Sequence, residues 1–168
     1  MGTPSIENAQ GGLEMIAIVY NNVGSAGKIE GFVEIVLGFM PEALIVISHP
    51  YGSGAQTGVP AASKRIFKSG GKLLVTSSLK EGIELINPFK VYVFEPKDRG
   101  ATEELNPEEI IEDMEKGNVM LVFGGESPGT PLREQELAHK VVWVGTPENI
   151  GAQAALAIAL YEIKKKLR

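Results

Sequence analysis

Three segments that follow apolar runs hold the residues best suited to chemistry. Residues 21–28 read NNVGSAGK and lead into a helical pattern. Residues 124–131 read GGESPGTP and hold one glutamate among glycines and prolines, and residues 145–155 read GTPENIGAQAA. Glycine lets a backbone approach a ligand closely, and a helix N-terminus favours an anion. The three segments therefore predict a ligand site built largely from backbone groups.

Each of these segments also has a plainer interpretation. The spacing of Gly24, Gly27 and Gly31 is that of neither a dinucleotide-binding fingerprint nor a Walker loop, so residues 21–28 could form an ordinary strand-to-helix turn. Glu126 could accept backbone N–H bonds rather than act as a base. The third segment could do no more than pack a helix tightly. Only the set as a whole points to a function.

A fourth segment, residues 49–58, is rich in glycine and long for a connection between a strand and a helix, which is often a sign of function. His49 could serve as a general base, bind phosphate, or be an ordinary loop histidine. The basic residues Lys64, Arg65 and Lys68 follow on a helical stretch. They are the best candidates for contacts to phosphate groups, with a solvated helix face as the alternative.

The elements that must position these segments are six short apolar runs that alternate with helical patterns. The runs are continuously apolar, which indicates strands of a mainly parallel sheet with helices on both faces. They cover residues 15–20, 43–48, 72–76, 90–94, 118–123 and 140–144. The helical patterns cover residues 28–39, 61–68 and 79–86, a helix that opens at 106–109, and a last helix from 149 or 150 to 166. The pattern predicts an α/β fold, in which ligands bind beyond the carboxyl ends of the strands.

Composition limits the function further. The chain has 168 residues and 18.0 kDa, which suits one domain, and we expect a mobile arm at 1–13 and a single domain at 14–168. It has no cysteine and two histidines, so zinc–thiolate and iron–sulfur sites are excluded and no metal is expected. No apolar run could span a membrane and no signal peptide opens the chain, so we expect a cytoplasmic protein. The net charge of -5 argues against a surface that is basic throughout.

In their order and spacing, the three segments resemble the motifs of the SPOUT methyltransferase superfamily, specifically its SpoU branch. Residues 22–28 match an Asn-x-Gly motif, with Lys28 where the family has arginine. Residues 124–129 keep the first glycine, the glutamate and the last glycine of a Gly-Asn-Glu-Gly-x-Gly motif. Residues 145–162 match a third motif that runs from a glycine through a small-residue helix to Leu-Tyr-Glu. The resemblance covers residues 15–168.

The resemblance implies a C-terminal trefoil knot, a homodimer, and S-adenosylmethionine held by the loops after the last three strands. It implies methyl transfer to tRNA or rRNA, by default to a ribose 2′-hydroxyl, with Asn22, Lys28 and Glu126 at the reaction site. Phosphates would be held by Lys64, Arg65 and Lys68 from either subunit. The implied donor-binding residues are Phe94, Glu95, Gly124, Gly125, Gly129, Val144, Gly145, Asn149, Ile150, Gly151 and Ala152.

Three departures from the motifs leave alternatives open: Lys28 replaces an arginine, Asn149 a serine and Gly151 an asparagine. Lysine can act as a base only if its pKa falls well below about 10, so the acceptor could be a ribose oxygen or a base nitrogen. A SPOUT protein that binds the donor or RNA without methyl transfer is one alternative. A flavodoxin-like binding domain is another. A nuclease of the Asp…Glu-x-Lys type fits poorly, because residues 162–164 (EIK) fall near the end of the last helix.

Overall fold

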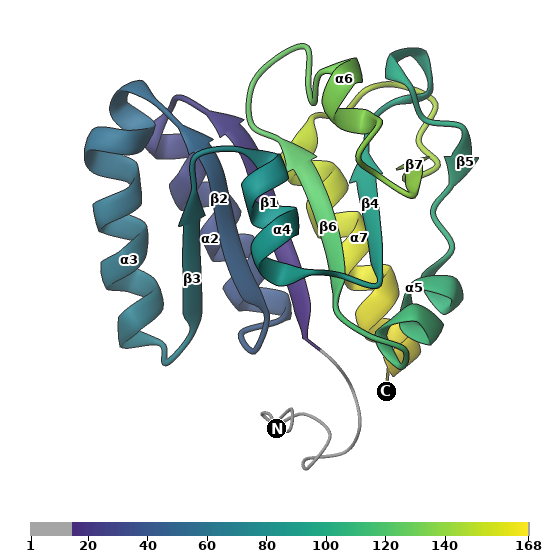
Figure 1. The fold of residues 1–168 in the computed structure, drawn as a ribbon, viewed down its shortest axis with the longest axis horizontal. Helices are drawn as coiled ribbons and strands as arrows, with labels where there is room; N and C mark the ends of the chain where they lie inside the picture. The colour runs from purple at the N-terminus through teal and green to yellow at the C-terminus, as the bar shows by residue number, and fades with distance from the viewer. Residues whose placement is uncertain (1–14, 168) are drawn as a thin grey trace.

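The computed structural model describes residues 15–167, which fold around one parallel sheet with helices on both faces (Figure 1). Within these residues seven strands lie in the order β3-β2-β1-β6-β4-β7-β5, and every pair is parallel. The strands are β1 (Ile16–Val23), β2 (Leu44–Pro50), β3 (Lys72–Thr76), β4 (Lys90–Phe94), β5 (Glu103–Glu104), β6 (Val119–Gly124) and β7 (Lys140–Trp143). The predicted α/β class is confirmed, and the six predicted strands are all present.

The helices follow the strands as the sequence pattern predicts. They are α2 (Ala26–Phe39), α3 (Val59–Lys68), α4 (Leu79–Ile86), α5 (Pro107–Met114), α6 (Leu132–Gln135) and α7 (Ala152–Leu167), with a π-helical turn η1 (Gly54–Gly58) and a 3-10 turn η2 (Lys97–Arg99). Side-chain oxygens of Ser25, Ser78 and Asn106 cap α2, α4 and α5 by accepting backbone N–H bonds. Pro107 opens α5, as expected for the first helical position.

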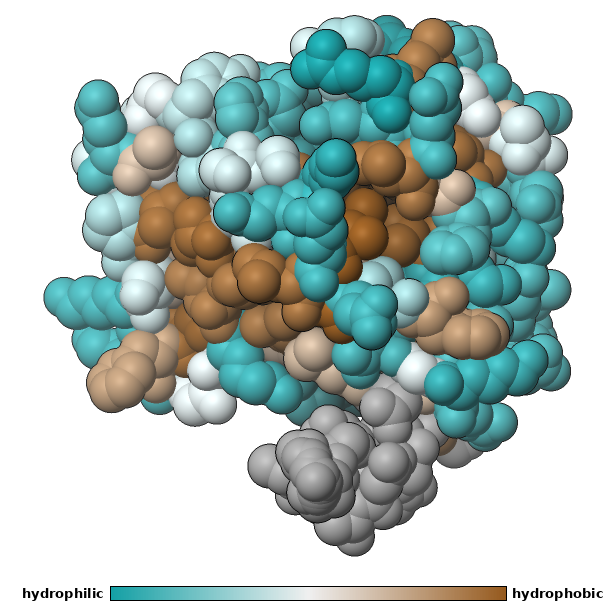
Figure 2. Space-filling view, in the orientation of Figure 1, coloured by the Kyte–Doolittle hydropathy of each residue, from teal (hydrophilic) through white to brown (hydrophobic). Residues whose placement is uncertain are grey.

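The two faces of the sheet are covered unequally. Helices α2, α3, α5 and α7 pack on one face and enclose the larger core, which includes Tyr20, Phe32 and Phe123. The other face is covered chiefly by α4, through Leu79 and Ile86. Figure 2 shows this second face, with apolar surface around α4. The prediction of helices on both faces is therefore right, although a single two-turn helix covers much of the second face.

Two expectations fall beyond what the structure shows. The arm at residues 1–13 lies outside the described residues, so the division between an arm and a domain at 14–168 stays a prediction. Threading of α7 through a loop to form a knot also stays a prediction. Among residues 15–167, no helix is both long enough and apolar enough to cross a membrane.

Candidate functional site

A cavity of about 790 Å³ lies at the carboxyl ends of β6, β4 and β7. These strands are neighbours in the sheet although they are separated in sequence. The loops that follow them therefore meet at one edge of the sheet. Residues 94–99, 124–129, 142–144 and 146–155 line the cavity, together with Tyr20 and Lys28 from the β1–α2 region. Two of the three segments singled out by spacing thus line one cavity, and the first segment contributes Lys28.

The structure gathers the expected donor-binding residues in this cavity with one exception. Gly145 is not among the lining residues. Its φ is +95°, and a Cβ placed on it would lie 2.8 Å from a carboxylate oxygen of Glu104. Gly145 therefore serves the turn after β7, where glycine suits the positive φ, and faces β5. The lining residues from the expected set are Phe94, Glu95, Gly124, Gly125, Gly129, Val144, Asn149, Ile150, Gly151 and Ala152.

Glu95 is a buried carboxyl group in the cavity wall, 7% exposed. It follows β4 and accepts a hydrogen bond from the backbone N–H of Thr130 at 2.7 Å. Burial raises the pKa of Glu95 to about 7, and the bond from Thr130 and the charge of Arg99 oppose that rise. Gly129 packs directly on the carboxylate, since a Cβ there would lie 2.4 Å from Oε1. Glu95 thus holds the 124–131 loop against the end of β4.

Lys28 and Glu126 form an ion pair at the cavity, with 2.9 Å between Nζ and Oε1. Lys28 also donates to the Gly125 carbonyl at 3.3 Å, and the other oxygen of Glu126 accepts from the backbone N–H of Gly24 at 2.9 Å. The hydrogen bond to Glu126 raises the pKa of Lys28 above its ordinary value. The bond from Gly24, followed by that from Lys28, lowers the pKa of Glu126. Lys28 therefore stays a cation at neutral pH, which argues against a role as a general base.

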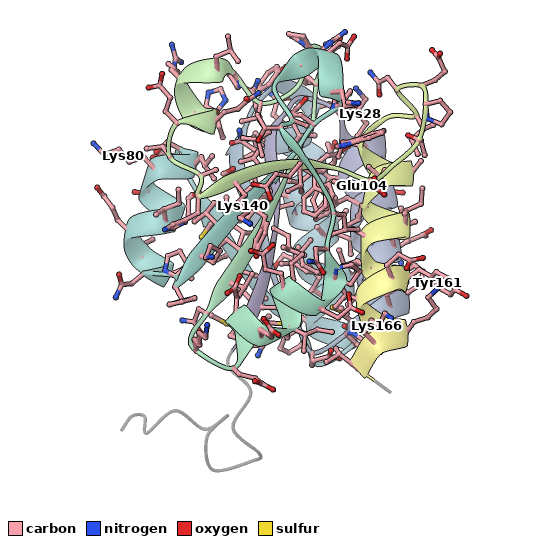
Figure 3. The ribbon with its side chains drawn as sticks, turned by 90° about the vertical axis from the view of Figure 1, so that its right-hand side faces the viewer. Lys28, Lys80, Glu104, Lys140, Tyr161 and Lys166 are labelled. Atoms are coloured by element: carbon pink, nitrogen blue, oxygen red, sulfur yellow. The ribbon has the colours of Figure 1, made fainter. Side chains whose placement is uncertain are left out.

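Figure 3 shows where Lys28 lies in the molecule: near the first turn of α7, below the loops at the top of the view. Gln153 in the first turn of α7 fixes this arrangement. Its amide nitrogen donates to the carbonyl oxygen of Lys28 at 3.1 Å. Its side chain also packs on Gly31, where a Cβ would lie 2.5 Å from the amide oxygen. The contact between α2 and α7 thus sets the position of Lys28.

Asn22 lies outside the cavity lining, next to His49. Its Oδ1 atom is 2.7 Å from Nδ1 of His49. Asn22 lies one residue before the end of β1 with a φ of +65°, and His49 lies one residue before the end of β2 with a φ of +51°. The three residues expected at the reaction site are therefore divided: Lys28 and Glu126 are paired, whereas Asn22 contacts a histidine on the neighbouring strand.

The sequence argument missed several residues that line the cavity. Tyr20 lies within β1 and stacks on Phe32, with 4.3 Å between ring centroids. Trp143 lies at the end of β7, and the ammonium of Lys97 is 4.8 Å from its ring. Trp143 is the single tryptophan of the chain and ends a strand of the expected sheet. That position would have marked it as a site residue.

The basic residues of α3 lie apart from the cavity. Helix α3 flanks β3 at one edge of the sheet, whereas β7 and β5 form the other edge (Figure 1). Lys64, Arg65 and Lys68 are exposed, and none of them lines the cavity. Arg65 pairs with Glu34 of α2 at 3.6 Å. Any contact of these residues with a ligand in the cavity of the same chain would need a long substrate.

The residues considered for nuclease chemistry lie along α7. Glu162 pairs with Lys165 at 3.3 Å, and Lys164 lies 3.8 Å from Glu42. Within the part of the chain that the structure describes, no three His, Cys, Asp or Glu side chains are grouped so as to hold one metal ion. Of the carboxylates in the cavity wall, Glu95 accepts from a backbone N–H group, and Glu126 accepts from a backbone N–H group and from Lys28.

Comparison with known proteins identifies the family by sequence. A family model described as RecB-family nuclease (DUF2122) matches residues 52–162. The chain belongs to this family. MjaORF1200P of Methanocaldococcus jannaschii, which bears a provisional type II restriction enzyme name, is 34% identical over 152 residues, 89% of this chain and 97% of the relative. ApeKORF2002P of Aeropyrum pernix bears the same kind of name and is 29% identical over 149 residues, 89% of this chain and 92% of the relative.

Solved structures similar to this DUF2122 protein belong to a different functional class. A structure from work on the 2-OH methylation of C/U34 on tRNA matches with a TM-score of 0.71 and 15% sequence identity, over 96% of each chain. The SpoU methyltransferase AviRb of Streptomyces viridochromogenes, solved in complex with AdoMet, matches with a TM-score of 0.70 and 11% sequence identity, over 97% of this chain and 64% of AviRb. TrmJ of Z. mobilis matches with a TM-score of 0.67 and 22% sequence identity, over 91% of this chain and 69% of TrmJ. At these identities the likeness establishes the fold, which is that of SPOUT methyltransferases.

Proposed function

We propose that this DUF2122 protein is an S-adenosylmethionine-dependent RNA methyltransferase that acts on tRNA or rRNA, by default at a ribose 2′-hydroxyl. The observation that carries the proposal is the cavity made by the loops after β6, β4 and β7. Those loops, with the helix α7 that follows β7, hold the motifs at residues 124–129 and 145–162 in the order and spacing that resemble the SpoU branch.

The cavity suits the methyl donor in size and chemistry. Small-molecule sites commonly enclose about 300–1,000 Å³, and this cavity of about 790 Å³ falls within that range. Glycines at 124, 125 and 129 leave backbone groups accessible to an adenosine or an amino acid moiety. The wall also carries the carboxylates of Asp98 and Glu148, which suit a ligand that bears an ammonium and a sulfonium.

When bound, the donor supplies a methyl group that is already activated, so the protein's task is chiefly alignment and electrostatics. Lys28 holds a positive charge at the cavity, fixed by Glu126 and the Gly125 carbonyl. A fixed cation stabilises negative charge that develops on an acceptor oxygen. Because the pKa of Lys28 is raised, we assign it this electrostatic role and leave proton removal to solvent or another group.

Incubation with S-[methyl-³H]adenosylmethionine and RNA from cells that lack the gene tests the proposal. We expect label in tRNA or rRNA, loss of labelling in Lys28→Ala, and normal labelling in Lys80→Ala. Lys80 is an exposed lysine of α4 on the far side of the sheet and makes a matched control (Figure 3). Donor binding without label in any RNA would contradict methyl transfer and favour a SPOUT protein that only binds.

A nuclease is the second candidate, because the family's description names that activity. The test is incubation of DNA and RNA with Mg²⁺ and the wild-type protein, beside Glu162→Gln. Cleavage by the wild type that is lost in Glu162→Gln, without any methyl incorporation, would overturn the methyltransferase proposal. Intact nucleic acid in both samples would count against the nuclease.

A further inference from the structure

Asn22 and His49 share an uncommon backbone conformation at the ends of neighbouring strands. Their φ angles are +65° and +51°, and the register of β1 and β2 sets them side by side. Residues other than glycine seldom hold a positive φ, and residues that do so cluster at functional sites. At the carboxyl ends of these two strands, the side chain of His49 is exposed. The fold thus maintains an uncommon conformation at a surface position.

The contact between these two residues fixes the histidine ring. Oδ1 of Asn22 can only accept, so Nδ1 of His49 is the donor across the 2.7 Å contact. A neutral His49 then presents an unprotonated Nε2 to solvent as a hydrogen-bond acceptor. The ring is further positioned by Tyr51, whose centroid lies 5.7 Å away with the planes 40° apart.

Tyr51 is an exposed aromatic ring on a rigid support. The ring packs on Gly24, where a Cβ would lie only 2.5 Å from it, and 43% of the residue is exposed. The backbone around it is tied to the β1–α2 loop: Tyr51 N–H donates to the Val23 carbonyl at 3.1 Å, and Gly54 N–H donates to the Gly24 carbonyl at 3.1 Å. The glycine of the Asn-x-Gly motif thus makes room for this ring.

This aromatic surface adjoins the candidate reaction site. Gly24 leaves no room for a Cβ beside the ring of Tyr51, and it donates its N–H to Glu126. Glu126 in turn pairs with Lys28 at the cavity. Gly24 therefore lies between the exposed ring of Tyr51 and the Lys28–Glu126 ion pair, and both the ring and the ion pair lie at the carboxyl ends of the strands.

We propose that His49 and Tyr51 form a site for an unstacked base of single-stranded RNA, next to the nucleotide that accepts the methyl group. The base stacks on Tyr51 and donates from its edge to Nε2 of His49. An aromatic ring is a surface on which any base can stack, which favours a base over a phosphate as the occupant. This inference rests on the proposed function, and it adds a contact to the RNA substrate outside the cavity.

Nuclear magnetic resonance of the two histidines tests the site directly. The chain has only His49 and His139, and His139 accepts a hydrogen bond from Val91 at the other end of the sheet, so it serves as an internal reference. The protein is titrated with each of the four ribonucleoside 5′-monophosphates and with inorganic phosphate. We expect the His49 signals to move with at least one nucleotide while those of His139 stay. Equal shifts with phosphate alone, or no shift with any nucleotide, would overturn the proposal.

Variants separate stacking from a change in folding. Stacking of one base is worth about 1–3 kcal/mol, so Tyr51→Ala should weaken nucleotide binding about fivefold or more, whereas Tyr51→Phe should keep it. Phe89→Ala is the control, because Phe89 is equally exposed at 42% and lies just before β4, away from the site. Equal affinity in Tyr51→Ala and the wild type would contradict the assignment.

The proposed function is checked separately in the same samples. Fluorescence of Trp143, which lines the cavity, reports binding of S-adenosylhomocysteine. Tyr51→Ala should leave that binding unchanged. Loss of nucleotide binding with intact binding of S-adenosylhomocysteine supports the base site. A wild type that binds S-adenosylhomocysteine but no nucleotide overturns the base site alone, and one that binds no S-adenosylhomocysteine overturns the proposed function.

Discussion

At the scale of single residues, the Lys28–Glu126 pair decides how the reaction could be catalysed. The resemblance to the SpoU branch leaves open whether Lys28 replaces the family's arginine as a base or as a charge. The ion pair with Glu126 at 2.9 Å raises the pKa of Lys28 and so favours the charge. Arginine cannot lose its proton in a protein, so the two residues can share an electrostatic role.

The electrostatic role predicts the effect of two substitutions. Lys28→Ala should lower the rate of methyl transfer about 100-fold or more, the usual loss when one group that stabilises an oxyanion is removed. Lys28→Arg should retain most of the rate. The rate profiles of the wild type and Lys28→Arg between pH 7 and pH 10 should have the same shape. A rise with pH that appears only in the wild type would show that Lys28 acts as a base.

Glu95 makes the stability of the protein depend on pH. Its pKa is about 7 in the folded protein and 4.5 without burial, so the folded state binds more protons between these values. The free energy of unfolding should therefore fall as pH rises from about 4.5 to 8, by about 3 kcal/mol from this group. Glu95→Gln should lose that pH-dependent part. Urea unfolding at pH 4.5, 6 and 8 measures it, and parallel curves for both proteins would contradict the assignment.

At the scale of elements, the loop after β6 is held by the contact between Gly129 and Glu95. Gly129 has a φ of +110° and no room for a Cβ against the carboxylate. Gly129→Ala should destabilise the protein by about 1–3 kcal/mol and weaken donor binding. Gly70→Ala is the matched control, since Gly70 has a φ of +77° with open space around it. Calorimetric titration should find weaker donor binding only in Gly129→Ala, and equal binding in both variants would contradict the role of this contact.

The sequence predicted elements that have a clear period or end signal, and missed those that have none. The apolar runs and the caps at Asn106 and Pro107 are strong signals. Strand β5 has two residues and α6 a single turn, which is too short for any period. The cavity could be predicted from segments that follow neighbouring strands. The separation of Asn22 from Lys28 could not, because it depends on a contact with His49 across the sheet.

At the scale of the whole molecule, we expect a homodimer of about 36 kDa, twice the 18.0 kDa of the chain. The resemblance places the interface on the last helix, where Tyr161 is 48% exposed and points outward from α7 (Figure 3). The apolar surface around α4, where Leu85 is 63% exposed, is the competing face (Figure 2). Light scattering after size exclusion should show a dimer that Tyr161→Glu dissociates and Leu85→Glu does not. The reverse result would move the interface to α4.

The central claim is that the cavity at β6, β4 and β7 binds the methyl donor, and calorimetric titration with S-adenosylmethionine tests it most directly. Ile150→Arg should block the cavity, because Ile150 lines it and is 41% exposed. Leu85→Arg makes the same chemical change outside the cavity. We predict saturable binding near one site per chain in the wild type and Leu85→Arg, and none in Ile150→Arg. A wild type that binds neither S-adenosylmethionine nor S-adenosylhomocysteine would contradict the account.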